Sequence, residues 1–322
     1  MKVNFIVEDS GPLKYLGCAT AAKNLFYELL KNIDVSWNDK SFDYDLVHFH
    51  TFGPRSMLYA KRFRGKKVIT AHSTPNLNTG NLAFPGAVNW LYIPIYNSFD
   101  HIIAVSEKCK KELINLNCKP EISTIYNGID IEKFVPNITK REKFRKKYGI
   151  EKDKMVVLTV AQRTPRKGIY DFLEISKLFP QIYFLWIGGF PYNLFSKDYS
   201  KVKRAIEQRS DNTIFPGFIE DISYAYSAAD VFFMPSYAEG HSIVMLEALS
   251  MGLPLIARDV EEFREAFGEN LLYFNNIEEL DEKKFDKNNL ELYRKKSDIV
   301  LKYTIEKMAQ DHTKLYEKII NL

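Results

Sequence analysis

Short, largely apolar runs of three to six residues recur along the chain, separated by stretches of helical or polar character. Runs without strict apolar and polar alternation are typical of strands buried on both faces, as in parallel sheets. Strands that alternate with helices predict doubly wound α/β domains. We therefore expect two βα arrays, with strands at residues 3–7, 46–49, 68–71, 102–105 and 122–125, and then at 155–160, 182–187, 231–234 and 255–257.

Length and composition agree with two arrays. A chain of 322 residues with 46% hydrophobic and 27% charged residues has the size of about two globular domains, which excludes disorder and a coiled coil. The charged stretch 140–154 separates the arrays, so we expect an N-terminal domain at residues 1–140 and a second domain at 150–303. Apolar residues at helical spacing predict a first amphipathic helix at residues 18–31 and a last one at about 304–322.

The chain carries no obvious signal for secretion or membrane insertion. The apolar stretch 82–96 is short for a bilayer span and is interrupted by proline, glycine and asparagine. The apolar run 3–7 is followed at once by two acidic residues, unlike a signal peptide. Cys18, Cys109 and Cys118 are odd in number and form no CxxC pair, so neither a disulfide framework nor a thiolate zinc site is expected. These features predict a cytoplasmic protein.

Charge is unevenly distributed along the sequence. Residues 1–150 contain 22 Lys and Arg against 14 Asp and Glu, a net charge of +8, and the remainder carries −4. The segment 61–67 alone has five cations, and Lys108, Lys110, Lys111 and Lys119 form a second basic stretch. Such asymmetry indicates an anionic partner, either an acidic membrane surface or nucleic acid, unless the lysines simply solvate the surface. The chain has no motif for reading nucleic acid with interleaved aromatic residues, so a nucleic-acid binder is the remote alternative.

The segment after the predicted strand 231–234 has the features of an anion site. A glycine loop leads into a helix for which Ser242 is the expected N-cap, and Met245 at the third helical position rules out a capping box. The amides of Ile243 and Val244 are then free to bind a phosphate group. In the same segment, Glu239 precedes the helix and can reach sugar hydroxyls. Glu247, eight residues later, can accept hydrogen bonds from a ribose.

This Glu-x7-Glu spacing lies within Pro-Ser-x-x-Glu-Gly…Leu-Glu-Ala-Leu-x-x-Gly-x-Pro at residues 235–254 and resembles the retaining nucleotide-sugar glycosyltransferases of family 4. Further matches are Asp45-Leu-Val-His-Phe-His-Thr51, Ala71-His72-Ser, Asn127-Gly-Ile-Asp130, Arg166-Lys-Gly168, Trp186-Ile-Gly-Gly189 and Pro216-Gly-Phe218. The resemblance implies a GT-B fold, in which two Rossmann-like domains face a cleft. We also expect the C-terminal helix to return to the N-terminal domain.

The resemblance also implies roles for individual residues. Glu239 would bind the hydroxyls of the donor sugar, Glu247 the ribose, and Lys167 would stabilise the leaving diphosphate. The family usually has an arginine five residues before that lysine, where this chain has Gln162, so either Arg163 or Arg166 would supply the second cation. His72 matches the active-site histidine that contacts the donor sugar.

Glycine positions complete the expected donor site. Gly17 would let the backbone approach the donor phosphates, and the loop of Gly217 and Phe218 would contact the nucleotide base, expected to be uracil. No GxGxxG motif is present, which argues against an NAD-dependent enzyme. His48, His50 and His72 together mimic a metal site, but no carboxylate follows at ligand spacing, so we expect no metal.

The sequence is thus identified as a member of family 4 with the expected activity of a hexosyltransferase that uses a UDP-sugar as donor substrate, without a tightly bound cofactor. Within the family it is most similar to bacterial enzymes that add a hexose, here expected to be glucose, to a glycolipid acceptor such as monoglucosyl-diacylglycerol. The aromatic residues of the stretch 82–96 would then lie at a membrane interface, unless they belong to the core of the N-terminal domain. A polysaccharide or soluble acceptor remains the alternative. The expected location is the inner face of the cell membrane, with peripheral attachment to anionic lipid.

Overall fold

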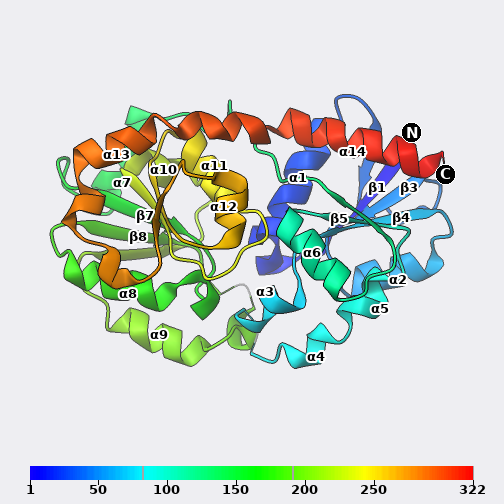
Figure 1. Cartoon of the computed structure of the whole chain (residues 1–322), viewed down its shortest axis with the longest axis horizontal. Coiled ribbons are helices and arrows are strands. Elements are labelled where there is room, and N and C mark those ends of the chain that lie inside the picture. The colour runs from blue at the N-terminus through cyan, green and yellow to red at the C-terminus, as the bar shows by residue number, and fades with distance from the viewer. Residues whose placement is uncertain (82, 191, 322) are drawn as a thin grey trace.

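The computed structural model describes residues 1–81, 83–190 and 192–321, and each half contains a six-stranded parallel sheet (Figure 1). The strand orders are β2-β1-β3-β4-β5-β6 and β12-β11-β10-β7-β8-β9, and the second is the order of Rossmann nucleotide-binding sheets. The predicted α/β class with two Rossmann-like domains is confirmed. The strands are β1 (Lys2–Ile6), β2 (Asp34–Trp37), β3 (Leu46–Phe49), β4 (Lys66–Ala71), β5 (His101–Ala104), β6 (Glu121–Thr124), β7 (Val156–Val160), β8 (Tyr183–Ile187), β9 (Thr213–Gly217), β10 (Val231–Met234), β11 (Leu255–Arg258) and β12 (Leu272–Phe274).

Helices connect the strands and cover both faces of each sheet (Figure 1). They are α1 (Gly17–Leu29), α2 (Pro54–Arg62), α3 (Pro75–Thr79), α4 (Gly86–Asn89), α5 (Tyr92–Tyr96), α6 (Glu107–Asn115), α7 (Ile138–Lys147), α8 (Ile169–Leu178), α9 (Tyr199–Glu207), α10 (Ser223–Ala228), α11 (Ile243–Ser250), α12 (Glu261–Phe267), α13 (Lys287–Arg294) and α14 (Ile305–Ile320). Single 3-10 turns include η1 (Gly11–Tyr15), η2 (Pro165–Lys167), η3 (Asn193–Phe195) and η6 (Ser297–Tyr303).

The sequence predicts nine of the strands to within two residues and misses β2, β9 and β12. All three missed strands lie at sheet edges. β2 and β9 are only partly buried, and β9 contains Pro216, so neither has the continuous apolar run of a central strand. Partial burial therefore explains why the apolar pattern does not reveal β2 and β9, but it gives no such reason for β12, whose three residues are all apolar.

The C-terminal helix returns to the N-terminal domain, as predicted. In Figure 1, α14 runs along the upper edge, passes α1, which it contacts, and ends at the right near the N-terminus, opposite the edge formed by α4 and α9. Its residues Met308, Leu315 and Ile319 share an apolar cluster with β1 and α1. Tyr316 is fully buried, and its hydroxyl lies 2.6 Å from Nδ1 of His48 on β3.

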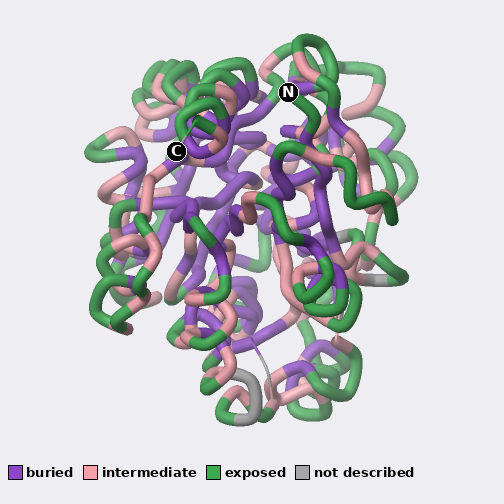
Figure 2. The backbone as a smooth tube through the Cα atoms, turned by 90° about the vertical axis from the view of Figure 1, so that its right-hand side faces the viewer, coloured by how far each residue is buried: buried purple, intermediate pink, exposed green. Residues whose placement is uncertain are grey.

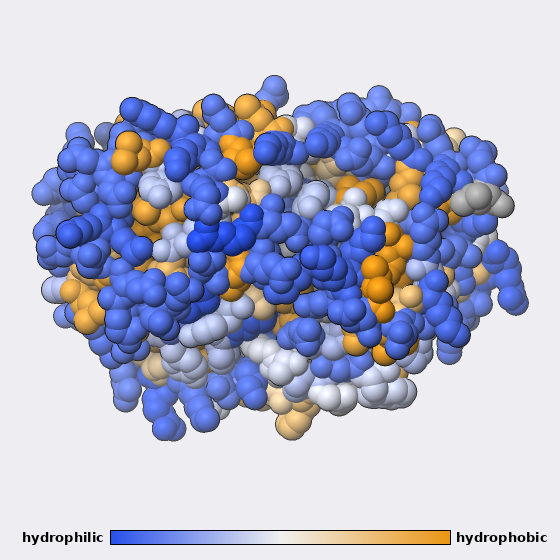
Figure 3. Space-filling view, in the orientation of Figure 1, coloured by the Kyte–Doolittle hydropathy of each residue, from blue (hydrophilic) through white to orange (hydrophobic). Residues whose placement is uncertain are grey.

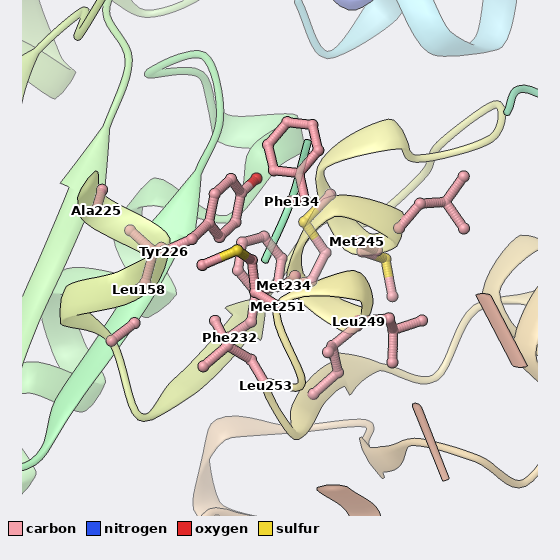
Figure 4. Packing of buried hydrophobic residues seen from close by; sticks show 14 of the residues in the cluster. Phe134, Leu158, Ala225, Tyr226, Phe232, Met234, Met245, Leu249, Met251 and Leu253 are labelled. Carbon is pink, nitrogen blue, oxygen red and sulfur yellow. The ribbon is translucent and has the colours of Figure 1, made fainter. Parts of the chain in front are cut away.

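Each sheet is the buried layer of its domain, and the outer helix faces carry the exposed residues (Figure 2). In the second domain, Tyr226 of α10 and Met245 of α11 pack over Phe232 and Met234 of β10 (Figure 4). Nearly every residue of α11 is buried. This packing fixes α11, whose first turn faces the N-terminal domain.

The stretch 82–96 divides between core and surface. Tyr92 and Tyr96 are buried in the N-terminal domain, whereas Phe84 and Trp90 are 72% and 68% exposed. Leu82 lies outside the described residues. The core interpretation is therefore confirmed for Tyr92 and Tyr96 and does not apply to Phe84 and Trp90, for which a membrane contact stays a prediction. None of the helices in the described ranges combines the length and apolar content needed to cross a bilayer.

Candidate active site

A cavity of about 690 Å³ lies between the two domains. The carboxyl ends of strands from both sheets lead into it: His72 follows β4, Gln162 follows β7 and Gly188 follows β8. Ligands of open α/β sheets bind at this edge. Of the residues predicted for the site, those that line the cavity are Gly17, His72, Lys167, Phe218, Glu239, Ser242, Ile243, Val244 and Glu247.

Three buried charged side chains meet at one wall of the cavity. Lys167, at the end of η2, places its Nζ 2.5 Å from Oε1 of Glu239 in the loop between β10 and α11. Arg166 places Nη1 3.6 Å from the other oxygen, Oε2. The three side chains are 9–13% exposed, so little water screens their charges. One carboxylate therefore faces two cations, and an anionic ligand at this wall would meet an excess positive charge.

Burial and mutual attraction set the pKa values of this cluster. Burial lowers the pKa of Lys167 to about 8, and the charge of Glu239 limits that fall. Burial alone would raise the pKa of Glu239, but the charges of Lys167 and Arg166 outweigh it and the pKa is lowered. At neutral pH both the lysine and the carboxylate are therefore charged.

The sequence leaves open whether Arg163 or Arg166 supplies the second cation, and the structure places these two side chains differently. The guanidinium of Arg163 lies over the rings of Phe215 and Phe190, 5.2 and 5.9 Å from their centroids, and Arg163 does not line the cavity. Its position argues against the predicted donor contact, because stacking on these rings turns the cation away from the ligand space. Arg166 lines the cavity instead. Its Nε donates to Oδ1 of Asn81 and its Nη1 to the carbonyl of Ala238, which tie it to both domains.

The first turn of α11 faces the same cavity. Ser242 is the N-cap, as predicted, and its side chain makes no capping hydrogen bond to the helix. The unpaired amides and the helix dipole of such a turn favour an anion. Further along α11, Glu247 is 6% exposed and accepts a hydrogen bond of 2.6 Å from the hydroxyl of Tyr226. Burial raises the pKa of Glu247 to about 7, although the tyrosine partly offsets it.

Histidines form a second polar cluster on the N-terminal wall. Nε2 of His72 lies 3.2 Å from Nδ1 of His50, and the centroid of the His50 ring lies 4.0 Å from that of His48, with the two rings tilted by 38°. Nε2 of His50 is buried without a partner in the described structure. Burial lowers the pKa of His72 to about 3, so this ring is neutral at physiological pH. A neutral ring can donate one hydrogen bond and accept one.

The three histidines do not converge on a common point. Nδ1 and Nε2 of His48 bond to Tyr316 and Thr70, and His50 bonds to His72. Among the described residues, no group of three or more His, Cys, Asp or Glu side chains is placed to hold a metal ion.

Two of the predicted glycines differ in what their backbone requires. Gly17 begins α1, and a Cβ there would meet no atom of the chain within 4 Å, so neither packing nor conformation demands glycine. It lines the cavity, where a missing side chain leaves room for a ligand. Gly217 has φ +85°, a left-handed conformation that favours glycine, and does not itself line the cavity. Its turn places Phe218 at the cavity wall.

Carboxylates of α12 join the domains behind the cavity. Glu265 accepts hydrogen bonds from the backbone amides of Glu107 and Lys108 in the first turn of α6, at 2.7 and 3.0 Å. Nζ of Lys108 lies 2.9 Å from Glu262, which also accepts from the amide of Glu239. The predicted basic stretch around Lys108 is therefore partly turned toward the second domain, because acidic residues of α12 face it.

Models of two glycosyltransferase families match the chain. The model described as Glycosyltransferase Family 4 matches residues 22–133, and the model described as Glycosyl transferases group 1 matches residues 140–287. Together they cover the N-terminal and second domains in turn. The chain therefore contains two glycosyltransferase domains and is a glycosyltransferase.

Relatives and solved structures cover nearly the whole chain. The processive diacylglycerol alpha-glucosyltransferase of Acholeplasma laidlawii is 28% identical over 100% of this chain and 99% of its own length. The alpha-galactosylglucosyldiacylglycerol synthase of Streptococcus pneumoniae is 29% identical over 85% of this chain and 77% of its own length. Anabaena HepE, solved in complex with UDP-glucose, superposes with a TM-score of 0.81 at 18% identity, covering 99% of this chain and all of that one. This last likeness shows the fold alone.

Sequence reasoning missed two polar residues of the site. Asn81 lies in an irregular loop after α3. Tyr226 lies on a short helix, α10, and the folded chain brings its hydroxyl to Glu247 on α11. Neither belongs to a motif with fixed spacing. Their contacts span 85 and 21 residues of sequence, which no local pattern records.

Proposed function

We propose that this glycosyltransferase transfers a hexose, glucose, from a UDP-sugar to a glycolipid acceptor such as monoglucosyl-diacylglycerol, with retention of the anomeric configuration. The observation that carries the donor half of this proposal is the buried Lys167 and Glu239 pair beside the first turn of α11 in the interdomain cavity. The acceptor half rests on the two relatives, whose names describe diacylglycerol glycolipid synthesis.

The donor would lie along the wall formed by the second domain. Lys167, Arg166 and the amides of Ile243 and Val244 would surround the diphosphate, and Glu239 would accept hydrogen bonds from the sugar hydroxyls. Glu247 would bind the ribose, and the backbone at Phe218 would contact the base. Gly17 would admit the phosphates from the opposite wall.

Catalysis in this proposal is electrostatic. Negative charge grows on the diphosphate as the glycosidic bond breaks, and fixed cations and amides stabilise that charge in a site with little water. Lys167 and Arg166 supply the charge from the chain itself, so the proposal assigns no resident metal. Neutral His72 would hydrogen-bond the donor sugar without adding positive charge next to an oxocarbenium-like centre.

The N-terminal domain would attach the enzyme to the cytoplasmic face of a membrane that contains anionic lipid. None of the five cations in residues 61–67 forms an ion pair with a described residue, so all five are available to lipid phosphates. Each cation close to an anionic surface contributes about 1 kcal/mol. We do not assign nucleic acid as a partner.

The test is a screen of donors and acceptors with the purified enzyme. UDP-glucose or UDP-galactose is incubated with monoglucosyl-diacylglycerol in vesicles, with a soluble glucoside, or with a polysaccharide, and products are identified by mass. Proton NMR of the product reports the anomeric configuration. Transfer from UDP-glucose to the glycolipid with an α-linkage supports the proposal. Transfer only to the soluble or polymeric acceptor, or a β-linked product, would contradict it.

A further inference from the structure

Two segments from different domains meet at the mouth of the cavity. The amide of Ala83 donates to the carbonyl of Phe195 at 2.9 Å, and the amide of Lys197 donates to the carbonyl of Asn81 at 2.8 Å. The two bonds run in antiparallel register, as in a short β-ladder. The loop between α3 and α4 is thereby joined to η3 of the second domain.

Large apolar side chains project from this junction into solvent. Phe84, Trp90, Leu194 and Phe195 are between 68% and 73% exposed, the four highest values among the described large hydrophobic residues. We call these four residues the apolar lip. Isolated exposed leucines are common, but Phe84, Leu194 and Phe195 flank the two interdomain hydrogen bonds, and Trp90 follows α4 six residues after Phe84. Such a set of exposed apolar side chains indicates a binding surface.

The lip lies beside the entrance to the active site. Asn81, three residues before Phe84, and Tyr192, two residues before Leu194, line the cavity. In Figure 1, α4 and α9 both lie along the lower edge, away from α14, and Figure 3 shows pale and apolar residues on this edge between the two halves. A ligand that covered the lip would therefore face the cavity mouth.

The surroundings of the lip are cationic. Residues 197–207, which continue from η3 into α9, contain Lys197, Lys201, Lys203 and Arg204 against two acidic residues. None of these four cations forms an ion pair with a described residue. Apolar and aromatic side chains next to unpaired cations are the composition of surfaces that enter the boundary between lipid headgroups and acyl chains.

We infer that the apolar lip inserts into a bilayer containing anionic phospholipid, so that both domains, and not the N-terminal domain alone, contact the membrane. This inference rests on the proposed function, in which the acceptor is a glycolipid. The lip exists only when the two domains are placed as they are here, because each contributes two of its residues. Lipid contact would therefore favour the arrangement that forms the cavity.

A short path links the lip to the charged cluster of the site. Asn81, three residues before Phe84, accepts hydrogen bonds from Nε of Arg166 at 3.0 Å and from the hydroxyl of Thr164 at 3.1 Å. Arg166 in turn faces Glu239. Binding of the lip to a bilayer and binding of a nucleotide to the cavity should then strengthen each other equally, since coupling between two sites is reciprocal.

The experiment compares the full-length enzyme with a lip variant, Leu194→Asp with Phe195→Asp. The matched control is Leu178→Asp with Leu292→Asp, which removes two leucines of the same domain that are 57% and 61% exposed and lie outside the lip. Co-sedimentation with vesicles of phosphatidylcholine and phosphatidylglycerol measures partitioning, and calorimetry measures the Kd for UDP with and without vesicles.

The lip variant should lose about tenfold or more in vesicle partitioning, because two large apolar side chains no longer leave water. The control should partition like the parent. In the parent, vesicles should tighten UDP binding, and the lip variant should lose this effect while its UDP affinity without vesicles stays unchanged. Retained partitioning in the lip variant would overturn the inference, and so would an equal loss in the control.

The outcomes separate this inference from the proposed function. If the enzyme transfers sugar only to soluble acceptors but loses vesicle binding when the lip is changed, the proposed glycolipid acceptor is wrong and the membrane role of the lip stands. If the enzyme uses the glycolipid but the lip variant partitions to vesicles normally, the membrane role of the lip is wrong and the proposed acceptor stands. If the parent self-associates, the lip variant does not, and vesicle binding is unaffected, then the lip binds a second copy of the chain and the inference of bilayer insertion is overturned.

Discussion

Basic residues in the two domains meet opposite environments. Lys167 of the second domain is buried against Glu239, whereas the cations of residues 61–67 in the N-terminal domain are exposed or half exposed and form no ion pair with any residue that the structure describes. A buried charge interacts strongly with a fixed partner, and an exposed charge is screened within about 8 Å at physiological salt. The first environment suits one ligand held in one geometry, and the second suits a diffuse anionic surface.

The comparison extends to position along the strands. The carboxyl end of β4 leads to His72 in the cavity, and its first residue, Lys66, belongs to the basic segment. At about 3.3 Å per residue, the six residues of this strand separate the two features by roughly 20 Å. One domain can therefore hold a reaction site at one end and a lipid-binding segment at the other without electrostatic conflict.

The largest effect is expected from removing one partner of the buried pair. Glu239→Gln and Lys167→Met should each lower turnover about 100-fold, as expected when a charge-assisted contact to the transition state is lost. Initial rates with saturating acceptor measure this. Glu261→Gln, which alters a carboxylate that is 59% exposed, serves as the control and should keep its rate. Normal turnover in either variant would remove the pair from the mechanism.

The pH dependence should show the low pKa of the lysine. Because burial lowers the pKa of Lys167 to about 8, turnover should fall about tenfold per pH unit above pH 8 as the cation is lost. Lys167→Arg should abolish this limb, since a guanidinium stays charged. The parent and the arginine variant showing the same alkaline limb would contradict the assignment.

Stability should depend on pH in the corresponding direction. Between pH 8 and the ordinary lysine pKa of 10.5, the folded state binds fewer protons at Lys167 than the unfolded state does, so this residue makes stability rise with pH. Glu247 acts oppositely: its raised pKa of about 7 means that the folded state binds more protons between pH 4.5 and 7, and its contribution is lost as pH rises through 7. Thermal unfolding of Glu247→Gln should lack that loss, whereas an unchanged pH profile would contradict the raised pKa.

The exposed cations should affect membrane binding and leave the reaction site intact. Replacing the five cations of residues 61–67 by glutamine should weaken binding to phosphatidylglycerol vesicles at least tenfold, since even two cations close to the surface contribute about 2 kcal/mol, and added salt should also weaken binding of the parent. The melting temperature should stay within a few degrees. The control replaces exposed cations at the far end of the second domain, Lys143, Lys146, Lys147 and Lys152. Equal binding to neutral and anionic vesicles would contradict this role.

The smallest effect concerns the orientation of His72. His50→Phe keeps a ring but removes the hydrogen bond of 3.2 Å to His72, and losing one neutral bond of about 1 kcal/mol should lower kcat about fivefold with little change in KM. The 15N signals of His72 should shift as its tautomer is released. His101→Phe, a buried histidine bonded to Ser123, is the control. Unchanged kcat and unchanged His72 signals would assign His50 to packing alone.

The sequence predicts most of the features that depend on local patterns, and few of those that depend on contacts between residues far apart in the chain. Central strands and the segment from Glu239 to Glu247 follow from apolar runs and fixed spacing, so they are predictable. The choice between Arg163 and Arg166 is not, because it depends on which side chain meets the rings of Phe190 and Phe215. The lip is likewise invisible in sequence, since its halves lie about a hundred residues apart and are joined only by the domain contact.

The most direct test of the central claim is calorimetric binding of UDP and UDP-glucose to the parent, Lys167→Met and Glu239→Gln. If Lys167 faces the diphosphate and Glu239 the sugar, the lysine variant should bind both ligands about 10- to 100-fold more weakly, as expected for the loss of a charge-assisted contact. The glutamine variant should lose affinity for UDP-glucose and bind UDP as the parent does. Parental affinity of both variants for both ligands would contradict the claim that this buried pair is the donor site.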